Sequence, residues 1–173
     1  SMQKIRGKYL SLCLAELERR KEAGGMTRRL RMTLPIALGM SGRYEAAHRE
    51  LDRLVAVYPE KEPDIIFQHA LFYHSQGEWD DLYETIRRYK SRVDFPNLTA
   101  DLMMINALIN INLGAQAMYV AQDARARFPG SQEVESAIAA IWDVFGHKEQ
   151  ALFVLMRANP EIITRPIAQL LFD

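Results

Sequence analysis

The chain alternates between apolar stretches and amphipathic stretches, each long enough for three or four helical turns. Apolar stretches such as "DIIFQHALFYHS" and "VESAIAAIWDVF" come before a glycine, and amphipathic stretches come after it. The amphipathic stretches end near a helix breaker, at Pro59, Asp94, Pro129 and Pro160. We find no Asn-Gly hairpin and no sustained alternation of apolar and polar residues, so the pattern predicts an all-α protein built from helix pairs.

The stretch that follows the glycine recurs along the chain. It reads "SGRYEAAHREL" at residues 41–51, "QGEWDDLYETI" at 76–86, "FGHKEQALFVL" at 145–155 and, with the glycine displaced, "LGAQAMYVAQDARARFP" at 113–129. Gly42 and Gly77 are 35 residues apart, and Gly146 follows 69 residues later, about two periods. A period in the thirties indicates stacked helix pairs, because a single pair cannot bury its apolar face alone.

The residues around these glycines match the pattern of a known repeat family. They are Gly42, Tyr44, Ala47, Leu51, Leu54 and Pro59 in the first repeat, Gly77, Trp79, Leu82, Ile86 and Tyr89 in the second, and Gly146, Ala151, Leu155 and Ala158 in the fourth. On these residues the chain resembles the tetratricopeptide-repeat (TPR) family over about residues 27–158. The resemblance implies a right-handed α-α superhelix, with glycine at each tight turn and a small residue, here Ala70 or Ala139, where paired helices approach closely.

We expect the repeats and their flanks to form one solenoid domain over residues 1–173. Its four helix pairs should occupy residues 27–59, 63–94, 97–129 and 131–160. Residues 3–23 read as an N-terminal capping helix with Ile5, Tyr9 and Leu12 on one side, and Gly24 with Gly25 should end it. Residues 161–173 read as an extra first helix with no second helix after it.

Two features depart from the family pattern. Pro35 stands where the first repeat should have a small residue, and a proline inside a helix removes a hydrogen bond. We therefore expect the helix either to bend at Leu34 or to start anew at Pro35. Chaperone-binding relatives carry Lys and Asn at groove positions where this chain has Met32 and Ile36, so that particular binding mode is not expected.

Charge and hydropathy exclude several classes of function. Residues 1–31 carry a net charge of +6 and the remainder −6, whereas a helical-repeat RNA binder should be basic along its whole groove. No apolar run approaches the roughly 18 residues of a membrane span. We find no signal peptide. We therefore expect a cytoplasmic protein with no nucleic-acid partner and no membrane insertion, unless the chain is excised from a longer exported one.

The sequence contains no set of residues typical of catalysis or metal binding. His69 and His74 are five residues apart and so lie on different faces, whereas a helical zinc pair needs a spacing of three or four. Cys13, the only cysteine, has no nearby His-Asp set, and we expect it to pack inertly. Paired carboxylates such as Asp80 and Asp81 look like solvated helix ends. We therefore predict a non-enzymatic protein with no metal and no cofactor.

The resemblance also implies a binding groove, because in this family the first helices line the concave face. In the third repeat we adopt the register that buries Leu102, Ile105 and Ile109. The candidate groove residues, counted back from the turns, are Arg29, Met32, Ile36, Phe67, Leu71, His74, Met103, Asn106 and Asn110, followed in the fourth repeat by Glu133, Ser136, Ala140 and Asp143. Met and Phe would form an adaptable apolar surface. The Asn side chains would either hold an extended peptide backbone or satisfy helix-end carbonyls inside the stack.

Two further surfaces are candidates for contacts. Arg28 and Arg31 crowd one turn near other basic residues, and they form either an anchor for an acidic stretch of a partner or a solvated helix end. The last stretch of the sequence is rich in large apolar residues, including Ile163, Ile167, Leu170 and Leu171. A contiguous apolar patch is costly in water, so we expect it to be covered by a second copy in a homodimer or by a further repeat.

The leading hypothesis is a scaffold or adaptor that binds a peptide or another protein in the concave groove. The alternatives are a fragment of a longer TPR superhelix, a self-associating assembly subunit, and a secretion-type TPR chaperone that cradles an amphipathic segment.

Overall fold

The computed structural model describes residues 2–158, and the chain divides into two compact units. The first unit ends at Phe72 and the second begins at Tyr73, so the boundary falls inside one helix. Over residues 2–158 all regular structure is helical, and the predicted all-α fold is confirmed.

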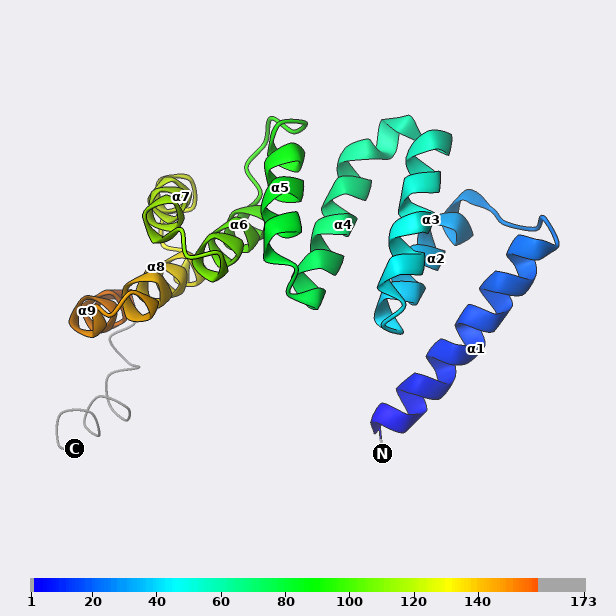
Figure 1. Cartoon of the computed structure of the whole chain (residues 1–173), viewed down its shortest axis with the longest axis horizontal. Coiled ribbons are helices and arrows are strands. Elements are labelled where there is room, and N and C mark those ends of the chain that lie inside the picture. The colour runs from blue at the N-terminus through cyan, green and yellow to red at the C-terminus, as the bar shows by residue number, and fades with distance from the viewer. Residues whose placement is uncertain (1, 159–173) are drawn as a thin grey trace. The chain divides into compact units, whose positions relative to one another are not determined.

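The first unit holds a long N-terminal helix followed by a helix pair and most of a further helix (Figure 1). Its elements are α1 (Met2–Glu22), α2 (Arg28–Met40), α3 (Tyr44–Val57), the short 3-10 helix η1 (Pro59–Lys61) and α4 (Glu62–Gln76), of which the last four residues belong to the second unit. α2 packs against α3, and α1 packs against α2. α1 therefore covers part of α2, the first helix of the first pair.

α1 packs through a different side from the one that the sequence suggested. Leu14 and Leu17 are buried in the core, and Leu10, one turn earlier, packs partly against it. The apolar residues on the other side are exposed: Ile5 by 54%, Tyr9 by 70% and Leu12 by 57%. Cys13, which we expected to pack, is exposed as well.

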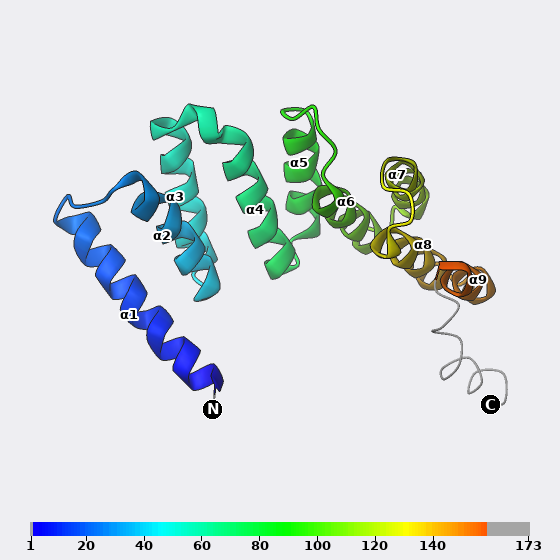
Figure 2. The same ribbon diagram turned by 180° about the vertical axis from the view of Figure 1, so that it is seen from behind.

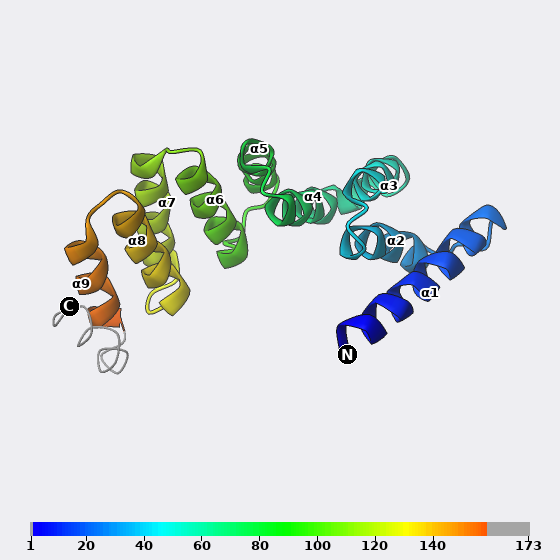
Figure 3. The same ribbon diagram turned by 60° about the horizontal axis from the view of Figure 1, so that its bottom comes forward.

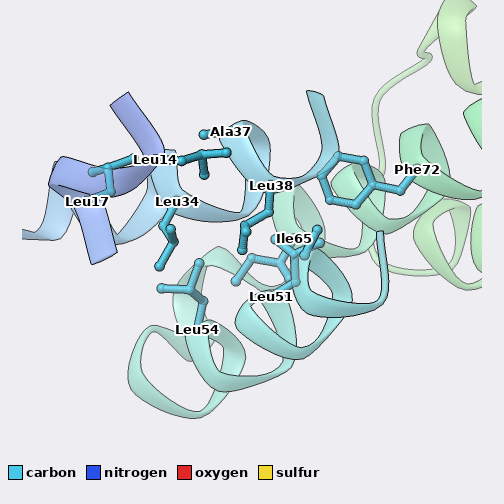
Figure 4. Packing of buried hydrophobic residues seen from close by; sticks show 10 residues of the cluster. Leu14, Leu17, Leu34, Ala37, Leu38, Leu51, Leu54, Ile65 and Phe72 are labelled. Carbon is cyan, nitrogen blue, oxygen red and sulfur yellow. The ribbon is translucent and has the colours of Figure 1, made fainter. Parts of the chain in front are cut away.

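The core of the first unit draws on all four helices. Figure 4 shows Leu38, Leu51 and Ile65, from three successive helices, lying together in one cluster. Gly39 lets α2 approach α4, since a Cβ at this position would overlap the ring of Phe72. Pro35 is fully buried inside α2, which runs without interruption from Arg28 to Met40, so no new helix begins at the proline.

The second unit consists of helices that pack in sequence order (Figures 2 and 3). They are α5 (Trp79–Lys90), α6 (Leu98–Asn110), α7 (Gly114–Arg127), α8 (Gln132–Val144) and α9 (Lys148–Ala158). α6 pairs with α7 and α8 pairs with α9, while α8 also contacts both helices of the preceding pair. None of the helices within residues 2–158 is both long and apolar enough to cross a membrane.

The first helix of each of three pairs begins at a side-chain cap. Thr27 Oγ1 accepts from the amide of Leu30, Asn97 Oδ1 from Ala100, and Ser131 Oγ from Val134, at 3.1–3.3 Å. Each cap satisfies one of the backbone N–H groups that a helix start leaves without a partner.

The turn between paired helices requires a residue with a left-handed backbone conformation, and the structure shows which residue provides it in the third repeat. Gly42, Gly77 and Gly146 have φ between 72° and 86°, and Asn112 has φ 62°. Asn112 lies 35 residues after Gly77 and 34 before Gly146, so it takes the glycine's place in the third repeat. Asparagine is one of the few non-glycine residues that adopt this conformation readily.

One charged group is buried in the second unit. The side chain of Asp101 on α6 is 1% exposed, and its carboxylate lies 2.6 Å from Lys90 Nζ on α5 and 3.0 Å from Arg127 Nη2 on α7. Arg127 also reaches Asp123 at 2.5 Å. A buried carboxylate needs such partners, and this one ties three consecutive helices together.

Candidate protein-binding surface

Three predicted groove residues form a connected polar row in the second unit. Asn106 Nδ2 donates to His74 Nε2 at 2.9 Å, and Asn110 Nδ2 donates to Asn106 Oδ1 at 3.1 Å. Because an amide nitrogen can only donate, His74 Nε2 is the unprotonated acceptor in this arrangement. Asn110 also donates to the Asn106 carbonyl at 2.8 Å, which corresponds to the helix-end role considered for it above. The ring of Trp79 meets His74 edge to face, with centroids 5.8 Å apart.

The register of α6 differs by one residue from the predicted register. Met103 and Ala107 are 5% and 0% exposed, so both are core residues and neither is available on the surface of this unit. Leu102 and Ile109, which we expected to be buried, are half-buried and share a side of the helix with Asn106. The predicted register was chosen to bury Leu102, Ile105 and Ile109, whereas counting back from the turn residue Asn112 selects Leu102, Asn106 and Ile109 for the surface.

The corresponding side of α8 borders an apolar cavity of about 580 Å³. Ser136, Ala140 and Asp143, three of the candidate groove residues of the fourth repeat, line it, and Leu152 and Leu155 of α9 form its other wall. Sequence reasoning missed the contribution of α9, because the second helices were assigned to packing alone.

In the first unit the predicted groove residues lie on two helices. Arg29, Met32 and Ile36 are three and four residues apart and therefore share one side of α2. Ile36 is 41% exposed, and Met32 packs partly against the core. Phe67 and Leu71 are half-buried on one side of α4. We use the name first-helix surface for the residues of each unit taken separately: these five in the first unit, and in the second unit His74, Leu102, Asn106, Ile109 and Asn110.

The two arginines of the predicted basic anchor have different surroundings. Arg28 lies over the ring of Tyr58 at 5.1 Å and pairs with Glu60 at 2.9 Å. Arg31 donates from Nε to the carbonyl of Met26 at 3.3 Å. Arg28 is thus engaged within the chain, whereas Arg31 also borders a pocket between α1, α2 and α3.

Two histidines meet in the core of the first unit. The rings of His48 and His69 stack with centroids 4.9 Å apart, and their Nδ1 atoms are 2.6 Å from each other. His69 Nε2 also lies 3.4 Å from Asp52 Oδ1. Nothing in the sequence pointed to this pair, because its members are 21 residues apart on different helices. Within residues 2–158 no three His, Cys, Asp or Glu side chains are grouped as a metal site would require.

The self-association residues proposed from the sequence, Ile163, Ile167, Leu170 and Leu171, lie outside the residues that the structure describes.

Comparison with known proteins identifies structural neighbours only. No protein-family model and no curated protein matches the chain. The solved structure of MamA from AMB-1 in a P212121 crystal matches with a TM-score of 0.70 and 21% identity, covering 89% of this chain and 90% of that one. MamA from MSR-1 in a C2 crystal matches with a TM-score of 0.65 and 18% identity, covering 90% of this chain and 96% of that one. At these identities the likeness shows a shared all-helical fold.

Proposed function

We propose that the chain is a non-enzymatic protein-interaction module, a scaffold or adaptor, that holds a segment of a partner protein on its first-helix surface. The observation that carries this proposal is the polar row His74–Asn106–Asn110, which runs beside the half-buried Leu102 and Ile109. Positioned amide groups fix the backbone of a bound segment, and neighbouring apolar side chains receive its side chains.

Two further considerations support the proposal. Helical-repeat proteins use the surface formed by successive repeats to bind partners, and the TPR resemblance and the MamA-like fold of this chain both support such a role. This surface also carries exposed apolar side chains, such as that of Ile36, which is 41% exposed. Exposed apolar residues that lie together mark interaction sites.

The test is affinity capture followed by measured affinities for the captured protein. Phe67→Ala probes the first unit and Ile109→Asp the second, and each should weaken binding by about 1–3 kcal/mol, the range for a buried anchor. Tyr119→Ala is the control, because Tyr119 is a large apolar residue, 76% exposed, on the second helix α7.

Circular dichroism must first show that each variant keeps its helix content. If Phe67→Ala and Ile109→Asp bind the captured protein as tightly as the unchanged chain, or if Tyr119→Ala weakens binding equally, the first-helix surface is not the binding site.

A second function, self-association into an assembly, is favoured by α1. Ile5, Tyr9 and Leu12 are each more than half exposed on one side of this helix, and such a stripe is costly unless something covers it. Light scattering should then give a mass that rises with concentration, and Ile5→Asp with Leu12→Asp should abolish the rise. A monodisperse monomer at tens of micromolar in the unchanged chain would exclude this function.

A further inference from the structure

A pocket of about 200 Å³ opens in the first unit where the end of α1, the start of α2 and the last two turns of α3 meet. Glu50, Arg53 and Val57 of α3 line it at helical spacing, together with Lys21 from α1 and Arg31 from α2. We call it the cationic pocket.

The charges around the cationic pocket do not balance. Glu50, whose side chain is 16% exposed, accepts from Lys21 Nζ and, at 2.6 Å, from Arg53 Nη1. Arg31 is held by the Met26 carbonyl at 3.3 Å and pairs with no carboxylate of residues 2–158. Three cations therefore face a single carboxylate, which leaves two positive charges in excess.

The floor of the cationic pocket is apolar. Leu34 and Leu54 are 3% and 5% exposed beneath it, while Val57 at its rim is 52% exposed. Small-molecule sites usually enclose about 300–1,000 Å³, so this smaller pocket matches one large side chain better than a whole cofactor.

The cationic pocket is separate from the first-helix surface. At 100° per residue, Arg31 and Leu34 lie on the opposite side of α2 from Met32 and Ile36. A ligand bound here would therefore contact none of the residues that the proposed function uses.

We propose that the cationic pocket binds an acidic segment of a partner protein, with one large apolar side chain against Leu34 and Leu54 and a flanking Glu or Asp on Arg31. An arginine guanidinium matches a carboxylate in charge and in geometry. A phosphate group would gain nothing from the apolar floor. A nucleic acid would need basic surface well beyond the pocket, which the net charge of −6 after residue 31 does not provide.

The probe is a fluorescein-labelled peptide with the sequence Gly-Glu-Glu-Leu-Glu-Glu-Gly, measured by fluorescence polarisation at physiological salt. We expect saturable binding that Arg31→Glu weakens by about tenfold or more and Arg31→Gln by less, as charge reversal and charge removal predict. Replacing the peptide's leucine by alanine should weaken binding too, and replacing its glutamates by lysine should abolish it.

Arg49→Glu is the matched control, because Arg49 is an exposed arginine of α3, the helix that carries Glu50 and Arg53, and it pairs with Glu45 outside the pocket. Arg49→Glu changes the net charge by the same amount as Arg31→Glu, and its affinity for the peptide should stay within about twofold of that of the unchanged chain. Equal weakening by Arg31→Glu and Arg49→Glu would show unspecific attraction and overturn the proposal, as would the absence of saturation at millimolar peptide. Neither result bears on the first-helix surface, which keeps its own variants.

Discussion

Lys90 Nζ donates to Oδ1 of Asp101 at 2.6 Å, and the carboxylate that accepts this bond is buried from solvent. Lys90 itself is 32% exposed, so its stem lies along α5 while its ammonium group reaches inward. Since Arg127 approaches the other oxygen of the same carboxylate, one anion from α6 is shared by a cation from each neighbouring helix.

Replacing this carboxylate should destabilise the second unit. Asp101→Asn leaves Lys90 without its anion, while Arg127 keeps only Asp123. Removing one partner of a buried pair costs about 3–5 kcal/mol, to be discounted here because both cations reach water. We expect a loss of about 2–3 kcal/mol in the free energy of unfolding, measured by urea denaturation. Asp123→Asn, at the exposed partner of Arg127, is the control and should cost less than about 1 kcal/mol. Equal losses in the two variants would show that burial of Asp101 is unimportant.

Gly114 should not tolerate a side chain. A Cβ at this first residue of α7 would lie 2.5 Å from the half-buried ring of Phe145, the residue that follows α8. Gly114→Ala should therefore cost about 1–3 kcal/mol of overpacking strain, visible as a lower thermal midpoint. Gly7→Ala is the control, because nothing surrounds Gly7 in the exposed part of α1, and alanine there should stabilise the helix by about 0.5–1 kcal/mol. A neutral Gly114→Ala would mean that the ring moves aside freely.

Substitutions of Asn112 should change the stability of the protein only through the backbone conformation that the new residue can adopt. Asn112 is exposed and has φ 62°, where a β-branched residue is strained, so Asn112→Val should lower stability by about 1–2 kcal/mol. Asn112→Gly should fold with no loss of stability, because glycine adopts this conformation without strain. Calorimetry of both variants would distinguish this from a side-chain role, in which glycine would be as damaging as valine.

Acid should release a contact in α1. Glu16 accepts hydrogen bonds from the side chains of Arg19 and Arg20, and these hold its pKa at about 2 rather than 4.5. A lowered folded-state pKa means that the contribution is complete above pH 4.5 and is lost as the pH falls toward 2. Carbon-detected NMR should show the Glu16 carboxyl titrating near pH 2.

The control for this titration is the double variant Arg19→Ala with Arg20→Ala. It should raise the pKa of Glu16 back toward its usual value. A titration midpoint of Glu16 near pH 4.5 in the unchanged chain would mean that Arg19 and Arg20 do not form these hydrogen bonds in solution.

Much of the helical framework could be predicted because it depends on local signals. Thr27, Asn97 and Ser131 begin helices where the sequence suggests, since each cap bonds to a backbone amide three residues away. The exception is instructive. The third turn has Asn112 in place of the glycine, so the groove register was chosen by burying Leu102, Ile105 and Ile109, and this choice placed the buried Met103 on the surface.

The polar contacts of the interior could not be predicted in the same way. His48 meets His69 across 21 residues of sequence, and Arg127 meets Asp101 across 26. Both pairs depend on how each helix is rotated about its axis relative to its neighbour. The pattern of apolar residues shows which side of a helix faces the core, but it does not define this rotation precisely enough to predict a polar contact. His74 and Asn106 of the polar row were both predicted as groove residues, but the hydrogen bond between them is seen only in the structure.

The exposed position of Cys13 has a practical consequence. It is the only thiol in the 173-residue sequence, and it stands on the solvent side of α1, next to Leu12 and one residue before the buried Leu14. A maleimide dye or a nitroxide would therefore attach to a single atom of the native protein. Energy transfer or dipolar coupling between two labelled copies would report how close their α1 helices come, with no substitution in the chain.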